Sequence, residues 1–270
     1  MSREYNRIVI LAFMKITMIG AGNVATQLAL ALKKAGHTLV QIYNRSSEAG
    51  TELARTVGAE FTTDMQTLLP ADVYIVAVKD DAIEERAKLL TAGTAVVTHT
   101  SGTKSLSLLK NCGDNYGIFY PLQTMTKQSK VDFKNVPVLI EGSNAETNQV
   151  LEGLARSISQ NVHRVDEEQR QWIHIAAVFA NNFTNHLFGI SEGIMLSHSL
   201  SFEILKPLIM QSIANVELYS PARIQTGPAA RGDMQTIEKH LVLLGDDHRL
   251  QQIYRILTES ILASANQNHE

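Results

Sequence analysis

The stretch that decides the fold is Lys15-Ile-Thr-Met-Ile-Gly20-Ala-Gly-Asn-Val-Ala25. Its first five residues form the short apolar run of a buried strand, and a helix pattern follows from Asn23 and ends at Gly36. The G-x-G-x-x-A sequence between them permits a tight turn, a close approach of the backbone to a pyrophosphate, and close packing of the helix on the sheet. A glycine-rich turn that binds nothing is the alternative. We predict a cofactor-binding turn made of Gly20, Ala21, Gly22, Asn23, Val24 and Ala25.

Strands and helices alternate along the chain after this turn. We predict strands at 15–19, 38–43, 59–62, 73–78 and 95–98, and helices at 23–35, 47–57 and 81–90, the last with Asp81 and Glu84 as a capping box. Further strands are expected at 117–120, 137–141 and 162–165, with a helix at 145–159. Continuous apolar strands separated by helices predict an α/β fold, a doubly wound, mostly parallel sheet of the Rossmann type.

The pattern becomes entirely helical after Asp166. Helices are expected at 167–197, with Gly189 and Gly193 as weak points, and at 202–219, where Pro207 kinks or restarts the helix. A loop at 220–232 precedes helices at 233–244 and 247–265. We therefore predict a Rossmann domain at 1–165 and an all-α substrate or dimerisation domain at 166–270. Residues 1–13, before the strong signal, are an extension or an extra strand.

The composition limits the classes of partner. The 270 residues carry a net charge of −3, so no basic excess points to nucleic acid. No apolar run approaches the length of about 18–20 residues that a membrane span needs. Cys112 is the single cysteine, which excludes an intramolecular disulfide and favours a reducing compartment, so we predict a cytoplasmic protein. No metal site is predicted.

The end of the second strand indicates which dinucleotide is bound. NAD sites usually carry an acidic residue here, which would repel a 2′-phosphate. This chain has Asn44, Arg45 and Ser46, which offer a neutral amide, a guanidinium and a hydroxyl. These groups suit NADP, although Arg45 as a solvated charge and Ser46 as a helix cap are the alternatives.

Polar residues also follow the fourth and fifth strands, where ligands of open parallel sheets bind. Val78 and Lys79 are predicted to line the cofactor, whereas Asp80 and Asp81 suit helix caps. His99 and Ser101 are placed to meet a substrate, and satisfying the backbone at the strand end is the alternative. Residues 120–124 form a further candidate edge of the cleft.

The helical half offers two more groups of candidates. His174 lies two turns before Asn181 and Asn182 and shares a helix face with them, which indicates a cleft-facing stripe. Interhelical hydrogen bonds in the core, or a dimer interface, are the alternatives. Arg231, in the loop before the expected N-cap Asp233, could hold a carboxylate or a phosphate, or could pair with Asp233. His240, on the following helix, is read as a satisfied core histidine.

These segments resemble a known group of proteins. The N-terminal half is similar to the superfamily of pyrroline-5-carboxylate reductases, 6-phosphogluconate and β-hydroxyacid dehydrogenases and deazaflavin-dependent NADP oxidoreductases. The whole chain resembles bacterial Rossmann-like proteins labelled NADP oxidoreductases, which carry a C-terminal helical domain of unknown function. The resemblance covers most of 14–250, and its most specific segment is 226–233. It implies NADP as cofactor and a homodimer built through the helical domains.

The chain departs from this pattern at two positions. The β-hydroxyacid dehydrogenases place a catalytic lysine on the long helix, four residues before an asparagine, and this chain has His174 and the later Asn181 and Asn182 instead. Their lysine chemistry is therefore not carried over. Tyr120 stands where the resemblance leads us to expect a histidine, so a histidine role at that strand end is not expected.

The sequence thus predicts an NADP-dependent reductase or dehydrogenase that transfers hydride between NADP(H) and a small carbonyl or imine substrate. His174 or His99 is the expected proton donor, Asn181 or Asn182 orients the substrate, and Arg231 binds an acidic group. A non-catalytic NADP-binding sensor or regulatory dimer is the alternative, and a structural dimer that has lost its ligand is a third reading. A deazaflavin remains open as hydride acceptor.

Overall fold

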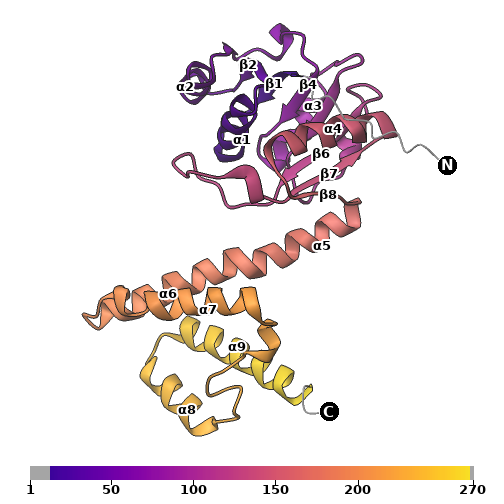
Figure 1. Cartoon of the computed structure of the whole chain (residues 1–270). Coiled ribbons are helices and arrows are strands. Elements are labelled where there is room, and N and C mark those ends of the chain that lie inside the picture. Colours follow the sequence, from indigo (N-terminus) through magenta and orange to yellow (C-terminus); the bar gives the residue numbers. More distant parts are fainter. Residues whose placement is uncertain (1–12, 268–270) are drawn as a thin grey trace, which may run out of the picture. The chain divides into compact units, whose positions relative to one another are not determined.

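The computed structural model describes residues 13–267, and its central element is an eight-stranded sheet (Figure 1). The strand order is β3-β2-β1-β4-β5-β6-β7-β8, with every neighbouring pair parallel except the antiparallel β6 and β7. This confirms the predicted doubly wound, mostly parallel sheet. The strands are β1 (Lys15–Ile19), β2 (Thr38–Tyr43), β3 (Glu60–Thr62), β4 (Val73–Val76), β5 (Val96–His99), β6 (Tyr116–Pro121), β7 (Val138–Gly142) and β8 (Val162–Arg164).

Helices cover both faces of the sheet. Successive residues of the central strands point to opposite faces, so each strand contributes side chains to two hydrophobic cores. In β4, Val73 and Ile75 join one hydrophobic core, and Tyr74 and Val76 join the other. The first core contains residues of α1 (Asn23–Lys34), α2 (Ser47–Val57) and α4 (Ala145–Ile158), and the second contains residues of α3 (Ile83–Ala87). Short 3-10 helices lie at Met65–Thr67, Asp80–Ala82, Leu106–Leu109 and Phe133–Asn135.

The predicted helix at 81–90 is present but shorter than expected, and its predicted capping box is wrong. Only Ile83–Ala87 is α-helical, and neither it nor the preceding 3-10 turn Asp80–Ala82 has a side-chain cap, so the capping box of Asp81 and Glu84 does not form. Glu84 instead pairs with Lys88 one turn later. Asp80 is not a helix cap either, because its carboxylate accepts hydrogen bonds from a neighbouring loop described below.

One long helical run begins after β8. It consists of α5 (Glu167–Ala177), a π-helical segment (Val178–Phe183) and α6 (Thr184–Ser197). The predicted weak points Gly189 and Gly193 lie inside regular α6, so the irregularity is the wider π turn instead. Pro207 sits in the first turn of the next helix and therefore restarts the chain as a helix. The remaining elements are the 3-10 turns Phe202–Ile204 and Pro221–Arg223, and the helices α7 (Lys206–Leu218), α8 (Met234–Leu243) and α9 (His248–Gln267).

The chain divides into two compact units, one that ends at His186 and one that begins at Leu187. The sequence places the change of domain at 165/166, where strands stop, but α5 and the π segment belong to the unit of the sheet. Hydrogen bonds join α5 to this unit: His174 bonds Tyr120 of β6, and Arg170 bonds Glu141 of β7 and the Lys104 carbonyl in the loop after β5. Whether residues 1–13 form an extension or an extra strand is a prediction that falls, except for Phe13, outside the described residues. Within 13–267, no helix has the length and apolarity that a membrane crossing requires.

Candidate functional site

The turn between β1 and α1 requires its two glycines for different reasons. Gly20 has φ +124°, and a Cβ there would lie 2.3 Å from the carbonyl oxygen of Ala77. Gly22 has an ordinary φ of −81°, and a Cβ there would meet no atom within 4 Å apart from those of Gly22 and its two chain neighbours. Gly22 also caps α1 without a side-chain acceptor, so the first N–H groups of α1 remain available. The turn therefore offers an open, donor-lined space that fits a pyrophosphate.

This turn forms one wall of a cleft of 570 Å³ at the carboxyl ends of β1, β2 and β4. Two of the predicted cofactor residues do not line it. Ala25 is fully buried and packs in the core. Ser46 is the exposed N-cap residue of α2, its hydroxyl makes no capping hydrogen bond, and its carbonyl accepts the Asn44 amide. The predicted residues that do line it are Gly20, Ala21, Gly22, Asn23, Val24, Asn44, Arg45, Val78 and Lys79. Lining residues that sequence reasoning missed as cofactor contacts are Tyr43, Ala77, Asp80, Ala82, Glu85, Arg86 and Thr100.

Two guanidinium groups line the cleft from separate elements. Arg45 follows β2, and Arg86 lies on α3 with its guanidinium carbon 5.8 Å from the centre of the Tyr43 ring. Arg86 also pairs with Glu85 at 3.2 Å, and its side chain is only 14% exposed. Guanidinium groups bind phosphate bidentately and stack on aromatic faces, so this end of the cleft suits the 2′-phosphate of NADP. Arg86 was missed because its helix carries no cofactor motif.

His99 is a fully buried structural residue at the end of β5. Its Nδ1 accepts the Ser101 N–H at 3.2 Å, so its Nε2 carries the proton that is donated to the Ser105 carbonyl at 3.2 Å. Burial lowers the pKa of His99 to about 4, which keeps the ring neutral. Both ring nitrogens are used within the loop, so the structure does not support the predicted proton-donor role for His99.

Ser101 has the same structural character. Its hydroxyl donates to the Asp80 carboxylate at 2.9 Å and accepts the N–H groups of Thr103 and Lys104 at 3.2 and 3.1 Å. Thr103 also donates to Asp80 at 2.9 Å. Asp80 therefore holds the loop after β5 in place through two hydrogen bonds. Ser101 is only 5% exposed and its hydroxyl is used within this loop, so it is not placed to bind a substrate.

A second hollow, of 630 Å³, lies between the end of β6 and the long helical run. At its edge the hydroxyl of Tyr120 lies 3.0 Å from Nδ1 of His174. Asn181 donates to the Thr124 hydroxyl at 2.6 Å, so the structure brings the predicted stripe to the predicted edge. The lining residues are Tyr120, Leu122, Gln123, Thr124, Ile173, His174, Ala176, Ala177, Val178, Ala180, Asn181 and Asn182, a set without a formally charged Lys, Arg, Asp or Glu in the part of the chain described.

Tyr120 belongs to the predicted cleft edge at 120–124, but sequence reasoning did not name it as a catalytic candidate. Burial, with a smaller effect of the negative charge of Asp80, raises the pKa of its phenol, so the group holds its proton at neutral pH. A polar side chain at the carboxyl end of β6 was the available signal. The structure adds the partner, because His174 comes from a helix 54 residues later in the chain.

The loop after β5 links the cofactor cleft to this pair. Thr100 lines the cleft, and two residues later a Cβ on Gly102 would lie 2.7 Å from Nδ1 of His174 and 2.8 Å from ring carbons of Tyr120. Only a glycine permits so close an approach. The Tyr120–His174 pair therefore lies beside the same loop that lines the cofactor cleft.

The remaining candidates belong to the second compact unit. Asp233 caps α8 as predicted, accepting the Thr236 N–H at 3.0 Å, and its pKa is lowered mainly by the Thr236 hydrogen bonds. His240 bonds the Tyr254 hydroxyl at 2.8 Å, which agrees with the reading of a satisfied histidine. Arg231 is exposed on the loop before α8, and its role as a ligand of an acidic group stays a prediction.

Comparison with known proteins identifies the family. Residues 15–102 match the family "NADP oxidoreductase coenzyme F420-dependent", and residues 136–261 match a domain of unknown function, DUF2520. The structure of a "putative NADP oxidoreductase" from Bacteroides fragilis is 39% identical, with a TM-score of 0.88, and the match covers 94% of this chain and 99% of that one. The chain belongs to this family of NADP oxidoreductases. The predicted NADP is confirmed as the cofactor of the family.

More distant solved structures share the fold of this NADP oxidoreductase. An imine reductase from Myxococcus stipitatus in complex with NADP+ is 16% identical, with a TM-score of 0.63 over 94% of this chain and 93% of that one. A 1-pyrroline-5-carboxylate reductase from Streptococcus pyogenes is 18% identical, with a TM-score of 0.62 over 93% of this chain and 98% of that one. No protein with a curated description matches the chain.

Proposed function

We propose that this NADP oxidoreductase reduces the C=N or C=O bond of a small substrate bound beside Tyr120 and His174. The observation that carries the proposal is the hydrogen bond between these two side chains, next to the loop that lines the cofactor cleft. NADPH supplies the hydride when it is bound. The protein then has to place the acceptor carbon near the cleft and to deliver one proton to the substrate heteroatom.

Tyr120 is the proposed proton donor. Its phenol is protonated at neutral pH, and it lies within hydrogen-bond reach of His174, which can replace the donated proton. As negative charge develops on the substrate nitrogen or oxygen, the phenolic proton moves to that atom. His99 has no part in this scheme because it is buried and fully hydrogen-bonded.

The hollow favours substrates without a formal charge. Its walls combine apolar residues with the amides of Gln123, Asn181 and Asn182, which orient polar groups through hydrogen bonds. Two solved structures of the same fold are named as an imine reductase and a pyrroline-5-carboxylate reductase, which makes imines the first substrates to screen. Arg231 remains a candidate for substrates that carry an acidic group.

We also propose that the protein is a cytoplasmic homodimer joined through its helical unit. Helix α7 exposes apolar side chains around its circumference, which is typical of an interface. Leu208, Met210, Ile213, Val216 and Leu218 are each between 51% and 73% exposed. The mass of the protein in solution, measured by light scattering, tests this proposal, and a monomer at micromolar concentration would refute it.

Calorimetric titration with NADPH and NADH, on the wild type and on Arg45→Ala, is the first test. We expect NADPH to bind at least about tenfold more tightly, a difference of about 1.4 kcal/mol, and the preference to be lost in the variant. A screen of imines, ketones and keto acids for NADPH oxidation follows. NADPH binding without turnover on any of them would favour the non-catalytic NADP-binding sensor, and binding of neither nucleotide would refute both.

A further inference from the structure

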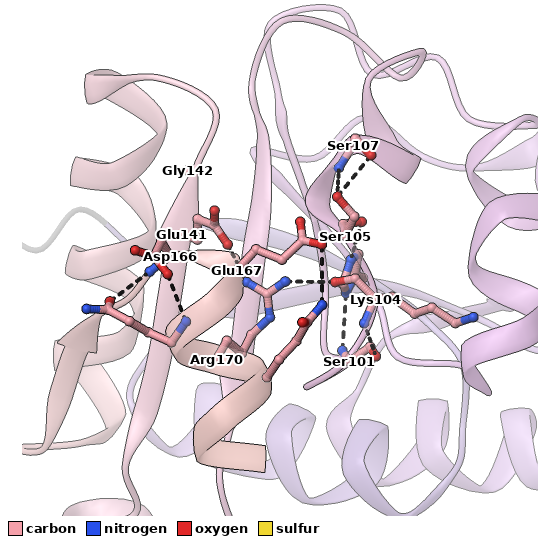
Figure 2. Close-up of polar contacts among 12 residues, drawn as sticks. Ser101, Lys104, Ser105, Ser107, Glu141, Gly142, Asp166, Glu167 and Arg170 are labelled. Atoms are coloured by element: carbon pink, nitrogen blue, oxygen red, sulfur yellow. Dashed lines mark hydrogen bonds and ion pairs between the residues drawn. The ribbon is translucent and has the colours of Figure 1, made fainter. Parts of the chain in front are cut away.

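Arg170, on α5, is the largest fully buried side chain among the described residues. Figure 2 shows its guanidinium between two segments of the sheet domain. Nη1 donates to the carboxylate of Glu141 on β7, and Nη2 donates to the carbonyl of Lys104, in the loop after β5, at 2.8 Å. Nε has no hydrogen-bond partner among residues 13–267. Arg170 therefore ties three segments together: α5, β7 and the loop after β5.

A buried ion pair of this kind is poor evidence for stability alone. The desolvation of two charges offsets most of their attraction, and well-packed apolar residues in the same place are often equally stable. The Arg170 side chain is fully buried and that of Glu141 is 18% exposed, so both charges are largely removed from water. The geometry of the three tied segments gives a better reason for the arrangement.

Each of the three segments that Arg170 joins carries, or lies next to, a residue of the Tyr120–His174 pair. Arg170 and His174 are four residues apart on α5 and lie on the same face, one turn from each other. Lys104 follows Gly102, whose position beside Nδ1 of His174 leaves no room for a Cβ. Glu141 lies on β7, which pairs with β6 in the register Tyr120↔Leu139. The three anchored segments are thus α5, which carries His174, the loop after β5, which carries Gly102, and β7, which pairs with the strand that carries Tyr120.

We propose that Arg170 is the positioning residue of the Tyr120–His174 pair. The guanidinium of Arg170 fixes the rotation of α5 and the distance between α5 and the sheet. These two quantities determine the geometry of the hydrogen bond between the Tyr120 phenol and the His174 imidazole. The catalytic use of this pair rests on the function proposed above. The positioning itself does not, so it can be measured without a substrate.

The test uses ¹⁵N-histidine-labelled protein and follows the ring nitrogens of His174 by NMR. His174→Gln assigns the signals, and Tyr120→Phe gives the shift that marks a lost hydrogen bond. Arg170→Lys keeps the charge but has no planar fork, so we expect it to displace the His174 signals in the same way. Arg164→Met is the matched control, because it removes another arginine paired with a glutamate in the same unit, at the surface.

Three readouts separate positioning from a general structural role. We expect the Kd for NADPH to change by less than about twofold in Arg170→Lys, since Arg170 does not line the cleft. The double variant Arg170→Met/Glu141→Leu removes both charges and is expected to keep a thermal midpoint near that of the wild type while the His174 signals stay displaced. With a substrate found in the screen, kcat is expected to fall about tenfold to a hundredfold.

The proposal is overturned if folded Arg170→Lys or the double variant retains the wild-type His174 signals. It is also overturned if both variants lose NADPH binding together with their fold, because the role of Arg170 is then structural. A wild type that never turns over refutes the proposed function but leaves the NMR result intact. The two proposals can therefore fail separately.

Discussion

Replacing each glycine of the β1–α1 turn by alanine is expected to separate folding from cofactor binding. Gly22→Ala places a methyl group where no atom lies within 4 Å apart from those of residue 22 and its two chain neighbours, at an ordinary φ of −81°. Gly20→Ala places it 2.3 Å from the carbonyl oxygen of Ala77, at φ +124°. The same chemical change two residues apart therefore has opposite consequences.

The magnitudes follow from this geometry. At Gly20 the backbone strain costs about 1–3 kcal/mol, and with the overlap at Ala77 we expect a loss of about 3 kcal/mol or more. This lowers the thermal midpoint by about 6–12 °C at 2–4 °C per kcal/mol. At Gly22 the loss of a capping glycine and the smaller entropy of the unfolded chain nearly cancel, within about 1 kcal/mol. The methyl group there blocks the pyrophosphate, and one lost charge-assisted hydrogen bond, about 1.5–3 kcal/mol, weakens NADPH binding about 10- to 150-fold.

Thermal denaturation by circular dichroism and calorimetric titration with NADPH measure the two effects on the same preparations. We expect Gly22→Ala to unfold like the wild type and to bind NADPH poorly. Wild-type affinity in Gly22→Ala would refute the placement of the pyrophosphate beside Gly22. An unchanged midpoint in Gly20→Ala would show that residue 20 does not adopt this left-handed conformation against Ala77 in the protein.

Three further changes test the site and its supports. Tyr120→Phe should lower kcat about 10²- to 10⁴-fold without weakening NADPH binding, and an unchanged kcat in steady-state assays would remove Tyr120 as proton donor. The pKa of His99 is about 4 in the folded chain and about 6.5 in the unfolded chain. As the pH falls, the unfolded chain therefore takes up a proton at His99 before the folded chain does. The free energy of unfolding should therefore decrease by up to about 3 kcal/mol between pH 6.5 and 4, and urea titrations of His99→Asn should show a flatter profile than the wild type. Gln27 donates to the carbonyls of Thr126, Lys127 and Ser129, so Gln27→Leu should speed amide exchange in that loop, and equal exchange rates would contradict this.

Much of the fold could be predicted from local features of the sequence. The strand, glycine turn and helix at 15–35 are consecutive in the chain, and Gly58 ends α2 in the left-handed conformation that glycine favours. The choice of NADP rested on neighbouring residues at the end of one strand, 44–46. Such features depend on periodicity and on the backbone freedom of single residues, which a sequence displays directly.

The candidate site depended on contacts between distant residues. Whether Asp80 caps a helix or braces the loop after β5 is decided by a hydroxyl 21 residues away. His99 looks like a proton donor in the sequence, but burial lowers its pKa and its own loop satisfies it. Periodicity carries no information about these pairings.

The sequence by itself determined a Rossmann domain with an NADP turn, followed by helices. Only the tertiary structure decided that α5 belongs to the sheet domain, because Arg170 reaches a carboxylate 29 residues earlier and a carbonyl 66 residues earlier. Only the tertiary structure placed the phenol of Tyr120 against His174. A hydrogen bond over such a separation forms when packing brings two elements together, and its energy depends on burial that no local pattern records.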